Sequence, residues 1–260
     1  MMENTDSDST KTVKATETTL DILDALRRLD GAGVTELSNH VDCSKAAIHH
    51  HLQTLRKQRY VVKEGTTYYL GLRFLGLGGR AVSRAEIYRF GKGEVDDLAE
   101  ATGETVQVVV EERGKGVYIY QSTGGERESV DTYLGMEVDL HSTAAGKCIL
   151  AHRGAEYVSA VIDAYGMQSN TPNTITETGT LLDELEDVRE TGIAFDDEEH
   201  IRGIRCVAAP VTSPQGALLG AVSLSAPVER MDDERFRTTV PNEVQNAVGI
   251  IEANIGYSQW

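Results

Sequence analysis

The first third of the chain repeats apolar residues at helical spacing. Leucines at every third position among charged residues predict a first helix over residues 17–29, with the leucines as its buried stripe. These leucines are Leu20, Leu23, Leu26 and Leu29. Two glycines end this helix, and Thr35 then stands where the cap of a short second helix, running through Val41, is expected.

A third helix is predicted over residues 44–59, with Ser44 as its cap. Ile48, Leu52 and Leu55 fall at positions i, i+4 and i+7, so they share one buried face. The opposite face is polar and partly basic, which suits entry into the major groove of DNA, where amide and imidazole groups meet base edges. This face holds Ala46, His49, His50, Gln53 and Lys57, with Lys45 and Arg56 on its border.

Three consecutive histidines, residues 49–51, do not predict a metal site. Only residues three or four positions apart share a helical face, so three neighbours cannot converge on one ion. His51 lies nearer the buried stripe and is expected to pack beside it. We therefore expect His49 and His50 to contact DNA.

Two β-prone runs follow directly, over residues 60–71, and join across Glu64 and Gly65. A hairpin immediately after the third helix predicts the wing of a winged helix-turn-helix domain. A winged helix used only for protein contacts is the alternative. The residues predicted to contact double-stranded DNA are Thr35, Ser44, Lys45, Ala46, His49, His50, Gln53, Arg56 and Lys63.

Beyond residue 93 the pattern changes to mixed helix and strand. A helix around residues 95–101 precedes two strands, 105–112 and 116–124, which are joined by a turn. A second strand-rich block comprises residues 192–199, 206–213 and 217–227, and a final helix is expected over residues 232–257. The sequence therefore predicts an α+β fold with a second, larger domain.

Charge divides the chain at about the same place. Over residues 11–80, eleven Lys and Arg face seven acidic residues, a net charge of +4, whereas residues 81–260 carry −17. Because DNA binding depends largely on neutralising phosphates, the basic segment fits a DNA-reading domain despite the overall charge of −16. The acidity also fits a halophilic organism with concentrated salt in its cytoplasm, and an ordinary acidic domain is the alternative.

The composition argues against several other classes of protein. Apolar residues make up 40% of the chain and charged residues 25%, as in globular proteins. No run approaches eighteen apolar residues, and the first fifteen residues lack the apolar stretch of a secretion signal, so we expect a cytoplasmic protein with no membrane partner. Cys43, Cys148 and Cys206 are far apart, which predicts neither a disulfide framework nor a zinc ribbon, and no cofactor is expected.

Two short segments of the second domain suit ligand binding. Residues 143–148, TAAGKC, lack the spacing of a phosphate-binding loop and instead predict a helix start. The small residues Ala144, Ala145 and Gly146 would let an anion approach the first backbone amides of this helix, with close packing as the alternative. Ser223 and Ser225 alternate along a strand, so both hydroxyls face one side of the sheet and suit a carboxylate or hydroxyl group.

An enzyme is the rival interpretation. Asp196, His200 and Cys206 could form a nucleophilic triad, or a metal site together with His141. The chain would then be a cysteine-dependent small-molecule hydrolase that uses a winged helix for assembly. Nothing in the sequence places these residues together, so we expect no enzymatic activity.

Several separate segments resemble the isocitrate lyase regulator (IclR) family of transcription factors. In the first domain they are TTLDILDAL, VTELSNHVDCSKAAIHHHLQTL and YYLGLRFLGLG. In the second they are LAEATGETV, LHSTAAGKCILA, TPNTIT, LDELEDVRETGIAFDDEEHIRGIRCVAAPV and GAVSLSAP. The resemblance extends from about residue 16 to residue 256.

This resemblance implies a winged helix-turn-helix domain joined by a helix to a GAF-like α/β effector-binding domain. The implied division is a disordered tail over 1–13, a DNA-binding domain over 14–78, a linker helix over 79–93 and the effector domain over 94–260. The linker helix is the second part of a connecting helix expected near residues 72–93. Dimers that pair through their amino-terminal domains, often associating into tetramers, and a pseudo-palindromic operator are also implied. The family commonly has arginine or another polar residue at the position of His50, so the base preference is not carried over.

The resemblance also implies where the effector binds. By motif position, the family's pocket falls on Ala144, Ala145, Gly146, Asp196, Ile204, Cys206, Ser223 and Ser225. Family ligands are small carbon metabolites, such as organic acids and aromatic or sugar breakdown products. The expected function is therefore transcriptional regulation in which a small metabolite changes affinity for the operator.

Overall fold

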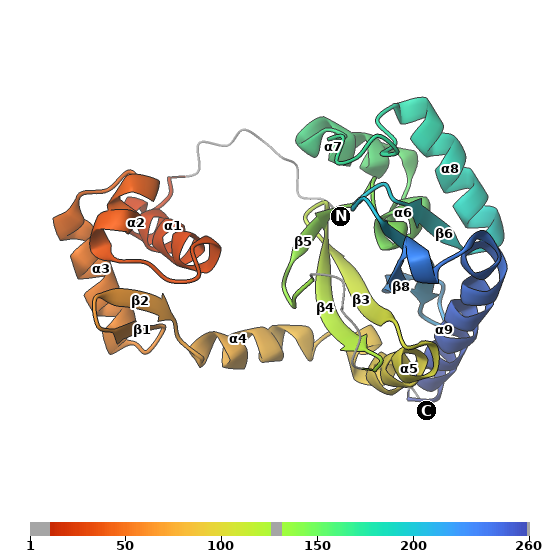
Figure 1. The fold of residues 1–260 in the computed structure, drawn as a ribbon, viewed down its shortest axis with the longest axis horizontal. Helices are drawn as coiled ribbons and strands as arrows, with labels where there is room; N and C mark the ends of the chain where they lie inside the picture. Colours follow the sequence, from red (N-terminus) through yellow and green to blue (C-terminus); the bar gives the residue numbers. More distant parts are fainter. Residues whose placement is uncertain (1–10, 126–131, 259–260) are drawn as a thin grey trace. The chain divides into compact units, whose positions relative to one another are not determined.

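A computed structural model describes residues 11–125 and 132–258, and they divide into two units between Ala81 and Val82 (Figure 1). Most of the predicted tail, residues 1–10, lies outside the described residues. The first unit is mainly helical with a two-stranded sheet. Its elements are α1 (Lys14–Arg28), α2 (Val34–His40), α3 (Lys45–Lys57), β1 (Val61–Glu64), β2 (Thr67–Leu70) and α4 (Arg73–Val82).

Helices α1 to α3 enclose the core of the first unit, and α3 has the buried face that the sequence predicted. Ile48 and Leu52 are fully buried, and Leu55 is nearly so. The predicted stripe on α1 is wrong in part. Leu26 is buried and Leu23 and Leu29 are partly buried as predicted, but Leu20 is 56% exposed and Ile22, which lies outside the predicted stripe, is fully buried. A repeat of three residues drifts by about 60° at each step around a helix of 3.6 residues per turn, so it cannot stay on one face.

Helix α2 also begins differently from the prediction. Gly33 occupies the cap position, no side chain caps this helix, and Thr35 is an exposed residue of the first turn. Strands β1 and β2 form the predicted hairpin, but Glu64 pairs with Thr67, so the turn falls at residues 65–66, one position later than expected. Gly65 has a φ of +58°, a conformation that glycine adopts without strain.

The connecting helix is two helices rather than one. Helix α4 ends at Val82, and α5 (Glu86–Thr102) begins after Ala85, whose backbone is extended. Ile87 and Val95 of α5 are fully buried in the core of the second unit. The predicted linker over 79–93 is therefore interrupted, because burial of these side chains makes α5 part of the second unit.

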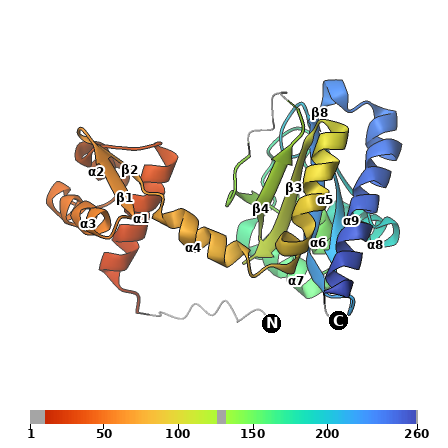
Figure 2. The ribbon, with the colours of Figure 1, turned by 90° about the horizontal axis from the view of Figure 1, so that it is seen from below.

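The second unit contains one six-stranded antiparallel sheet in the order β5-β4-β3-β8-β7-β6. Helices α5 and α9 cover one face, and α6, α7 and α8 cover the other (Figures 1 and 2). The strands are β3 (Thr105–Glu112), β4 (Lys115–Thr123), β5 (Glu137–Asp139), β6 (Ala194–Asp197), β7 (Ile204–Thr212) and β8 (Leu218–Pro227). The remaining elements are α6 (Ala144–Ala151), α7 (Ala155–Tyr165), α8 (Thr178–Thr191), a 3-10 turn (Val228–Arg230), a π turn (Arg235–Thr239) and α9 (Val240–Tyr257).

This architecture confirms the α+β prediction, and residues 143–148 do begin a helix. The side chain of Thr143 accepts a hydrogen bond from the backbone N–H of Gly146 at 3.1 Å and so caps α6. The predicted final helix is present as the π turn followed by α9. The strands predicted from alternation are β3, β4, β6, β7 and β8, whereas β5 was not predicted.

None of the helices within residues 11–125 and 132–258 combines the length and apolar character that crossing a lipid bilayer requires.

Candidate DNA-contact face and ligand pocket

The exposed face of α3 is created by burial of its other face. Ser44 caps the helix by accepting a hydrogen bond from the N–H of Ala47 at 3.2 Å, as predicted. With Ile48 and Leu52 in the core, the side chains opposite them point to solvent. The nine residues predicted to contact DNA are all exposed: Thr35, Ser44, Lys45, Ala46, His49, His50, Gln53, Arg56 and Lys63.

His51 differs from its two neighbours. Its Nδ1 atom lies 2.8 Å from the hydroxyl oxygen of Thr19 on α1. The Thr19 hydroxyl donates to the carbonyl of Ala15 at 2.7 Å, so its oxygen can accept a hydrogen bond from His51 in the tautomer with the proton on Nδ1. This hydrogen bond joins α3 to α1, which confirms that His51 packs beside the core.

A basic hollow lies between the end of α3 and the wing. Its lining includes three arginines and Lys63, of which the sequence had indicated only Arg56 and Lys63. Arg73 stacks on Tyr60, with 4.7 Å from its guanidinium to the ring centre, and donates to the carbonyl of Gln58 at 2.6 Å. Arg59 and Arg73 were missed because they lie outside the predicted helix face, in the segments on either side of the hairpin. Arginine in such a hollow suits contact with phosphate.

In the second unit, sheet register brings distant residues into one row. Asp196 on β6 pairs with Cys206 on β7, and Cys206 pairs with Ser225 on β8. Ser223 lies two residues before Ser225 and pairs with Gln107 on β3. All of these side chains face α6, because positions paired across strands share one face of a sheet. The prediction that both serines face one side is confirmed.

A β-bulge brings Tyr118 to the same face. Val108 pairs with Tyr120, but Val109 pairs with Tyr118, so Ile119 is an additional residue on β4. The bulge directs Tyr118 toward α6 and Tyr120 toward α5. Without it, the two tyrosines would share a face, and so alternation alone could not have identified Tyr118.

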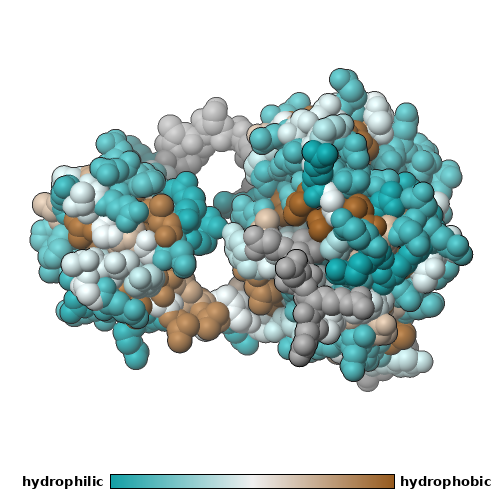
Figure 3. All heavy atoms as spheres, viewed as in Figure 1, coloured by the Kyte–Doolittle hydropathy of each residue, from teal (hydrophilic) through white to brown (hydrophobic). Residues whose placement is uncertain are grey.

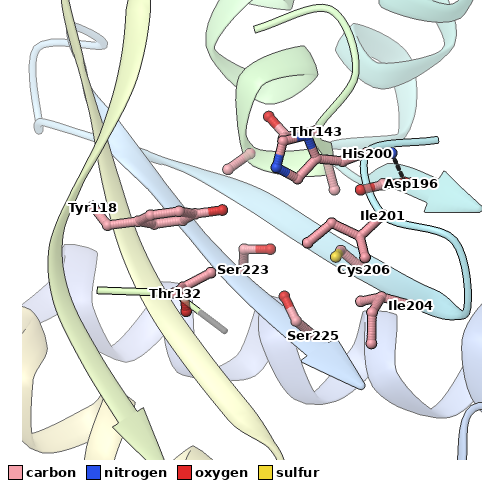
Figure 4. Close-up of a pocket in the computed structure, with 12 residues that line it drawn as sticks. Tyr118, Thr132, Thr143, Asp196, His200, Ile201, Ile204, Cys206, Ser223 and Ser225 are labelled. Carbon is pink, nitrogen blue, oxygen red and sulfur yellow. Dashed lines mark hydrogen bonds between the residues drawn. The ribbon is translucent and has the colours of Figure 1, made fainter. Parts of the chain in front are cut away.

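These side chains lie around one narrow pocket with a cavity volume of about 10 Å³ (Figure 4). This volume holds about one water molecule, well below the ~300 Å³ or more of a typical ligand pocket, so a metabolite can enter only if the pocket widens. The lining surface is more apolar than polar, although hydroxyl, thiol and carboxyl groups are part of it. Seven of the eight residues predicted for the effector pocket line it. Of the other five, His200 had been indicated only as a member of the rival triad, and Tyr118, Thr132, Thr143 and Ile201 had not been predicted as pocket residues. The lining consists of Tyr118, Thr132, Thr143, Ala144, Ala145, Asp196, His200, Ile201, Ile204, Cys206, Ser223 and Ser225.

Gly146 is the predicted pocket residue that does not line the cavity. A Cβ atom at this position would stand 2.3 Å from the carbonyl oxygen of Leu140, closer than any side chain allows. The absence of a side chain at Gly146 therefore allows α6 to pack closely against the preceding loop. Ala144 and Ala145 are in the first turn of α6, where backbone N–H groups have no partner within the helix.

Asp196 is the acidic residue of the pocket wall, and it is only 1% exposed. Its Oδ1 atom accepts hydrogen bonds from the backbone N–H groups of Glu199, at 2.7 Å, and His200, at 3.2 Å. Burial raises the pKa of Asp196 to about 7; these N–H groups lower it in part, and the nearby charge of Glu199 raises it. The carboxyl group can therefore be neutral or charged near neutral pH.

The loop after β6 supplies two further side chains, His200 and Ile201. Burial lowers the pKa of His200, so its imidazole is neutral at neutral pH. Its buried Nδ1 atom has no hydrogen-bond partner among the described residues. Such an atom is costly to bury unless something binds it, and here it belongs to a side chain of the pocket wall.

A buried ion cluster lies behind Asp196. The Nζ atom of Lys147 on α6 is 2.5 Å from Oε1 of Glu199 and 2.9 Å from Oε1 of Glu184 on α8. Lys147 is fully buried, so these two carboxylates, rather than water, stabilise its positive charge. The cluster connects the helix that begins at the pocket to the loop that follows Asp196.

The geometry does not support the hydrolase alternative. Burial and the charge of Asp196 raise the pKa of the Cys206 thiol well above its ordinary value, whereas a nucleophilic cysteine needs a lowered one. Asp196 binds the backbone N–H of His200 rather than its imidazole. Across the described residues, no three His, Cys, Asp or Glu side chains gather closely enough to hold a metal ion.

Comparison with known proteins gives a consistent result. Residues 79–252 match the family model described as bacterial transcriptional regulator IclR C-terminal, and residues 15–65 match the IclR helix-turn-helix domain. A probable HTH-type transcriptional regulator ArcR of Halobacterium salinarum is 35% identical over 244 residues, covering 91% of each chain. The HTH-type transcriptional regulator KdgR of Escherichia coli is 33% identical, covering 92% of this chain and 91% of its own length.

Solved structures agree with this. The crystal structure of the Thermotoga maritima IclR has a TM-score of 0.77 at 27% identity and covers 93% of this chain and 98% of its own. The C-terminal domain of Escherichia coli KdgR is 31% identical with a TM-score of 0.58, and it covers 66% of this chain and 99% of its own.

Proposed function

The chain belongs to the IclR family of transcriptional regulators, and we propose that it binds its operator through α3 and the wing, under the control of a small metabolite bound in the pocket of the second domain. The regulators to which it is similar are not enzymes by name, so the function is DNA binding rather than turnover. A cytoplasmic location is part of this proposal, because the DNA partner lies there.

For the DNA-binding half, we propose two kinds of contact. His49, His50 and Gln53 would contact base edges, since they lie exposed on the face opposite the buried stripe. The exposed cations around the hollow, Arg59 and Arg73 among them, would contact phosphate. The remaining predicted residues, Thr35, Ser44, Lys45, Ala46, Arg56 and Lys63, would border this surface.

For the effector-binding half, one observation carries the proposal. Hydroxyl, thiol and carboxyl groups from four strands converge at the start of α6, in a cavity whose wall includes the unpartnered Nδ1 of His200. An aromatic hydrocarbon would leave the Nδ1 atom of His200 without a partner, which is unfavourable. We therefore favour an oxygen-rich organic acid or sugar catabolite over an aromatic one. Ala144, Ala145, Asp196, Ile204, Cys206, Ser223 and Ser225 would contact it, and Gly146 would support α6.

We also propose that α4 pairs with α4 of a second copy. Leu72 is 82% exposed, Leu75 is 71% exposed and Leu77 is 54% exposed, and brown surface marks α4 in Figure 3. The glycines of α4 have open space where a Cβ would stand, so another helix can approach closely. Burial of these exposed leucines against a second copy of the chain would give a two-fold dimer, which suits a pseudo-palindromic operator. Two such dimers would make the tetramer.

Sedimentation velocity tests the pairing. Leu72→Glu together with Leu75→Glu should produce monomers, whereas Arg84→Glu, a charge change at an exposed position just beyond α4, should leave the assembly unchanged. Persistence of dimers in the double variant would contradict the assignment. The mass of the unmodified protein distinguishes a dimer from a tetramer.

The proposed function as a whole is tested by sequencing the DNA bound to the protein in cells. The recovered operator then serves in gel-shift assays at several salt concentrations, and the neighbouring genes indicate metabolites to add. Salt-dependent binding that one metabolite changes is the expected result. A winged helix used only for protein contacts would give no salt-dependent binding.

A further inference from the structure

The pocket wall carries a carboxyl group and no lysine or arginine. Its titratable residues are Tyr118, Asp196, His200 and Cys206. Burial raises the pKa of the Tyr118 hydroxyl and of the Cys206 thiol, so both are neutral, and the imidazole of His200 is neutral as well. The charge state of the wall therefore depends on Asp196.

The cation nearest to Asp196 is already engaged. Lys147 contributes one positive charge, and it contacts carboxylate oxygens of both Glu199 and Glu184. Glu199 is 6% exposed and is held beside Asp196 by the hydrogen bond from its backbone N–H. Asp196 thus lies beside a second carboxylate, Glu199, and the charge of Lys147, which lowers the pKa of Asp196 in part, is shared with two other carboxylates. His141, on the loop before α6, donates a hydrogen bond from Nε2 to the carbonyl of Gln168 at 3.1 Å and supplies no ion pair to Asp196.

An anionic ligand that enters this pocket meets a like charge if Asp196 is ionised. The first backbone amides of α6, at Ala144 and Ala145, suit an anion, but the buried carboxylate of Asp196 would repel one in the same pocket. If Asp196 is protonated, the repulsion between its carboxylate and the anionic ligand disappears, and its O–H becomes a hydrogen-bond donor to the ligand. Anion binding and proton uptake at Asp196 therefore favour each other.

We propose that the pocket binds a carboxylate effector together with one proton taken from solvent, which Asp196 holds and donates as a hydrogen bond to the ligand. This inference rests on the proposed role of the pocket in effector binding. Burial raises the pKa of Asp196 to about 7, so protonating this carboxyl group near neutral pH requires little free energy.

Linkage gives the sign of the effect. Below the pKa of free Asp196 the affinity for a carboxylate is constant, because the acid form is already present. Above this pKa, the fraction of Asp196 that is protonated falls about tenfold for each pH unit, so the dissociation constant of the carboxylate rises about tenfold per unit. A ligand without a carboxylate has no such dependence.

Infrared spectroscopy of the full chain tests the proposal without DNA. The probes are D-gluconate and its uncharged counterpart D-glucitol, with acetate and D-glycerate as smaller carboxylates. A band from a protonated carboxyl group should titrate with a midpoint of about 7 and be missing in Asp196→Asn. Carboxylates should move the midpoint upward, and D-glucitol should not. Asp197→Asn, on the neighbouring position of β6, should retain the band.

Three results would overturn the proposal: an ordinary midpoint for Asp196, a midpoint that none of the three carboxylates moves, or one that D-glucitol moves equally. The measurements on unmodified protein decide this even if Asp196→Asn does not fold. Operator binding is measured separately, so failure of the infrared titration leaves the proposed DNA binding standing, and failure of DNA binding leaves the titration interpretable.

Discussion

The Nζ atom of Lys147 lies 2.5 Å from Oε1 of Glu199, in an interior where Lys147 has no exposed surface. A buried charge that loses its partner is strongly destabilising, whereas removing both charges is much less so. We expect Lys147→Met to lower the free energy of unfolding by about 3 to 5 kcal/mol, and Lys147→Met with Glu199→Gln to recover most of this loss. Urea unfolding at neutral pH measures both changes.

A partly exposed pair provides the control. Lys115 lies 2.6 Å from Asp139 with about a quarter of each side chain exposed, so Lys115→Met should cost about 1 kcal/mol or less. Equal losses for the two lysine variants would contradict the role assigned to burial.

A second buried ion cluster predicts how stability depends on pH. Glu104 is fully buried in its side chain and accepts hydrogen bonds from Arg230 at 2.6 Å and Arg235 at 2.9 Å. Burial alone would raise the pKa of Glu104, but these arginines outweigh it and lower the pKa below its ordinary 4.5. The ionised form therefore stabilises the fold above about pH 4.5, and this contribution is lost as pH falls through the lowered value.

Glu104→Gln should then destabilise the protein by about 3 kcal/mol at pH 7, and the difference from the unmodified protein should shrink below about pH 4.5. Thermal or urea unfolding over this pH range checks the prediction. Glu137→Gln, at an exposed position on β5, should have little effect at any pH. If Glu104→Gln lowered the free energy of unfolding by the same amount at every pH, the charge of Glu104 would not be what stabilises the fold.

For the reading face, the double variant His49→Ala with His50→Ala should weaken operator binding. Each lost base contact is worth about 1 to 3 kcal/mol, so the affinity should fall at least tenfold, while binding to unrelated DNA changes little. Footprinting and gel shifts measure both. His152→Ala, an exposed histidine of the second domain, is the matched control. An intact footprint would mean that another surface reads the operator.

For the pocket, Ser223→Ala with Ser225→Ala should raise the effector concentration needed for half response by about tenfold and leave effector-free operator affinity unchanged. Ser225 also donates to Oε1 of the buried Gln107 at 3.1 Å, so a small loss of stability is expected. Ser122→Ala serves as control, because Ser122 pairs with Val106 on the opposite face of the sheet. Loss of both responses, or of neither, would contradict the assignment.

The acidic surface predicts a dependence on salt. Net charge of −16 destabilises the compact state through self-repulsion, which salt screens. If the chain functions in a concentrated cytoplasm, its melting temperature should rise as KCl is increased to molar concentration. Greatest stability below physiological salt would rule out the halophilic interpretation. The 35% identity to a Halobacterium regulator motivates this measurement.

Sequence reasoning succeeded where one periodicity governs a whole element. Ile48 and Leu52 follow the helical repeat, and Ser223 and Ser225 follow the strand repeat, so the face of each could be predicted. It failed in part on α1, where four leucines at every third position suggested one buried stripe but Leu20 is exposed.

Other features depend on contacts that sequence spacing does not contain. The break between α4 and α5 follows from the burial of Ile87 in the second core. Tyr118 enters the pocket only because of the bulge at Ile119. His200 reaches the wall through the loop whose N–H groups bind Asp196. For the pocket, therefore, the motifs identified the strand residues, and the loop and bulge residues required the structure.

The sheet register that gathers the pocket residues has a consequence for how such regulators diversify. Strands β6, β7 and β8 are aligned by backbone hydrogen bonds, which do not depend on the side chains at positions 196, 206 and 225. Exchange of one of these side chains alters what the cavity recognises while the ladder beneath it stays aligned. A regulator of this design can therefore acquire a new inducer through a few point substitutions, without rebuilding its fold.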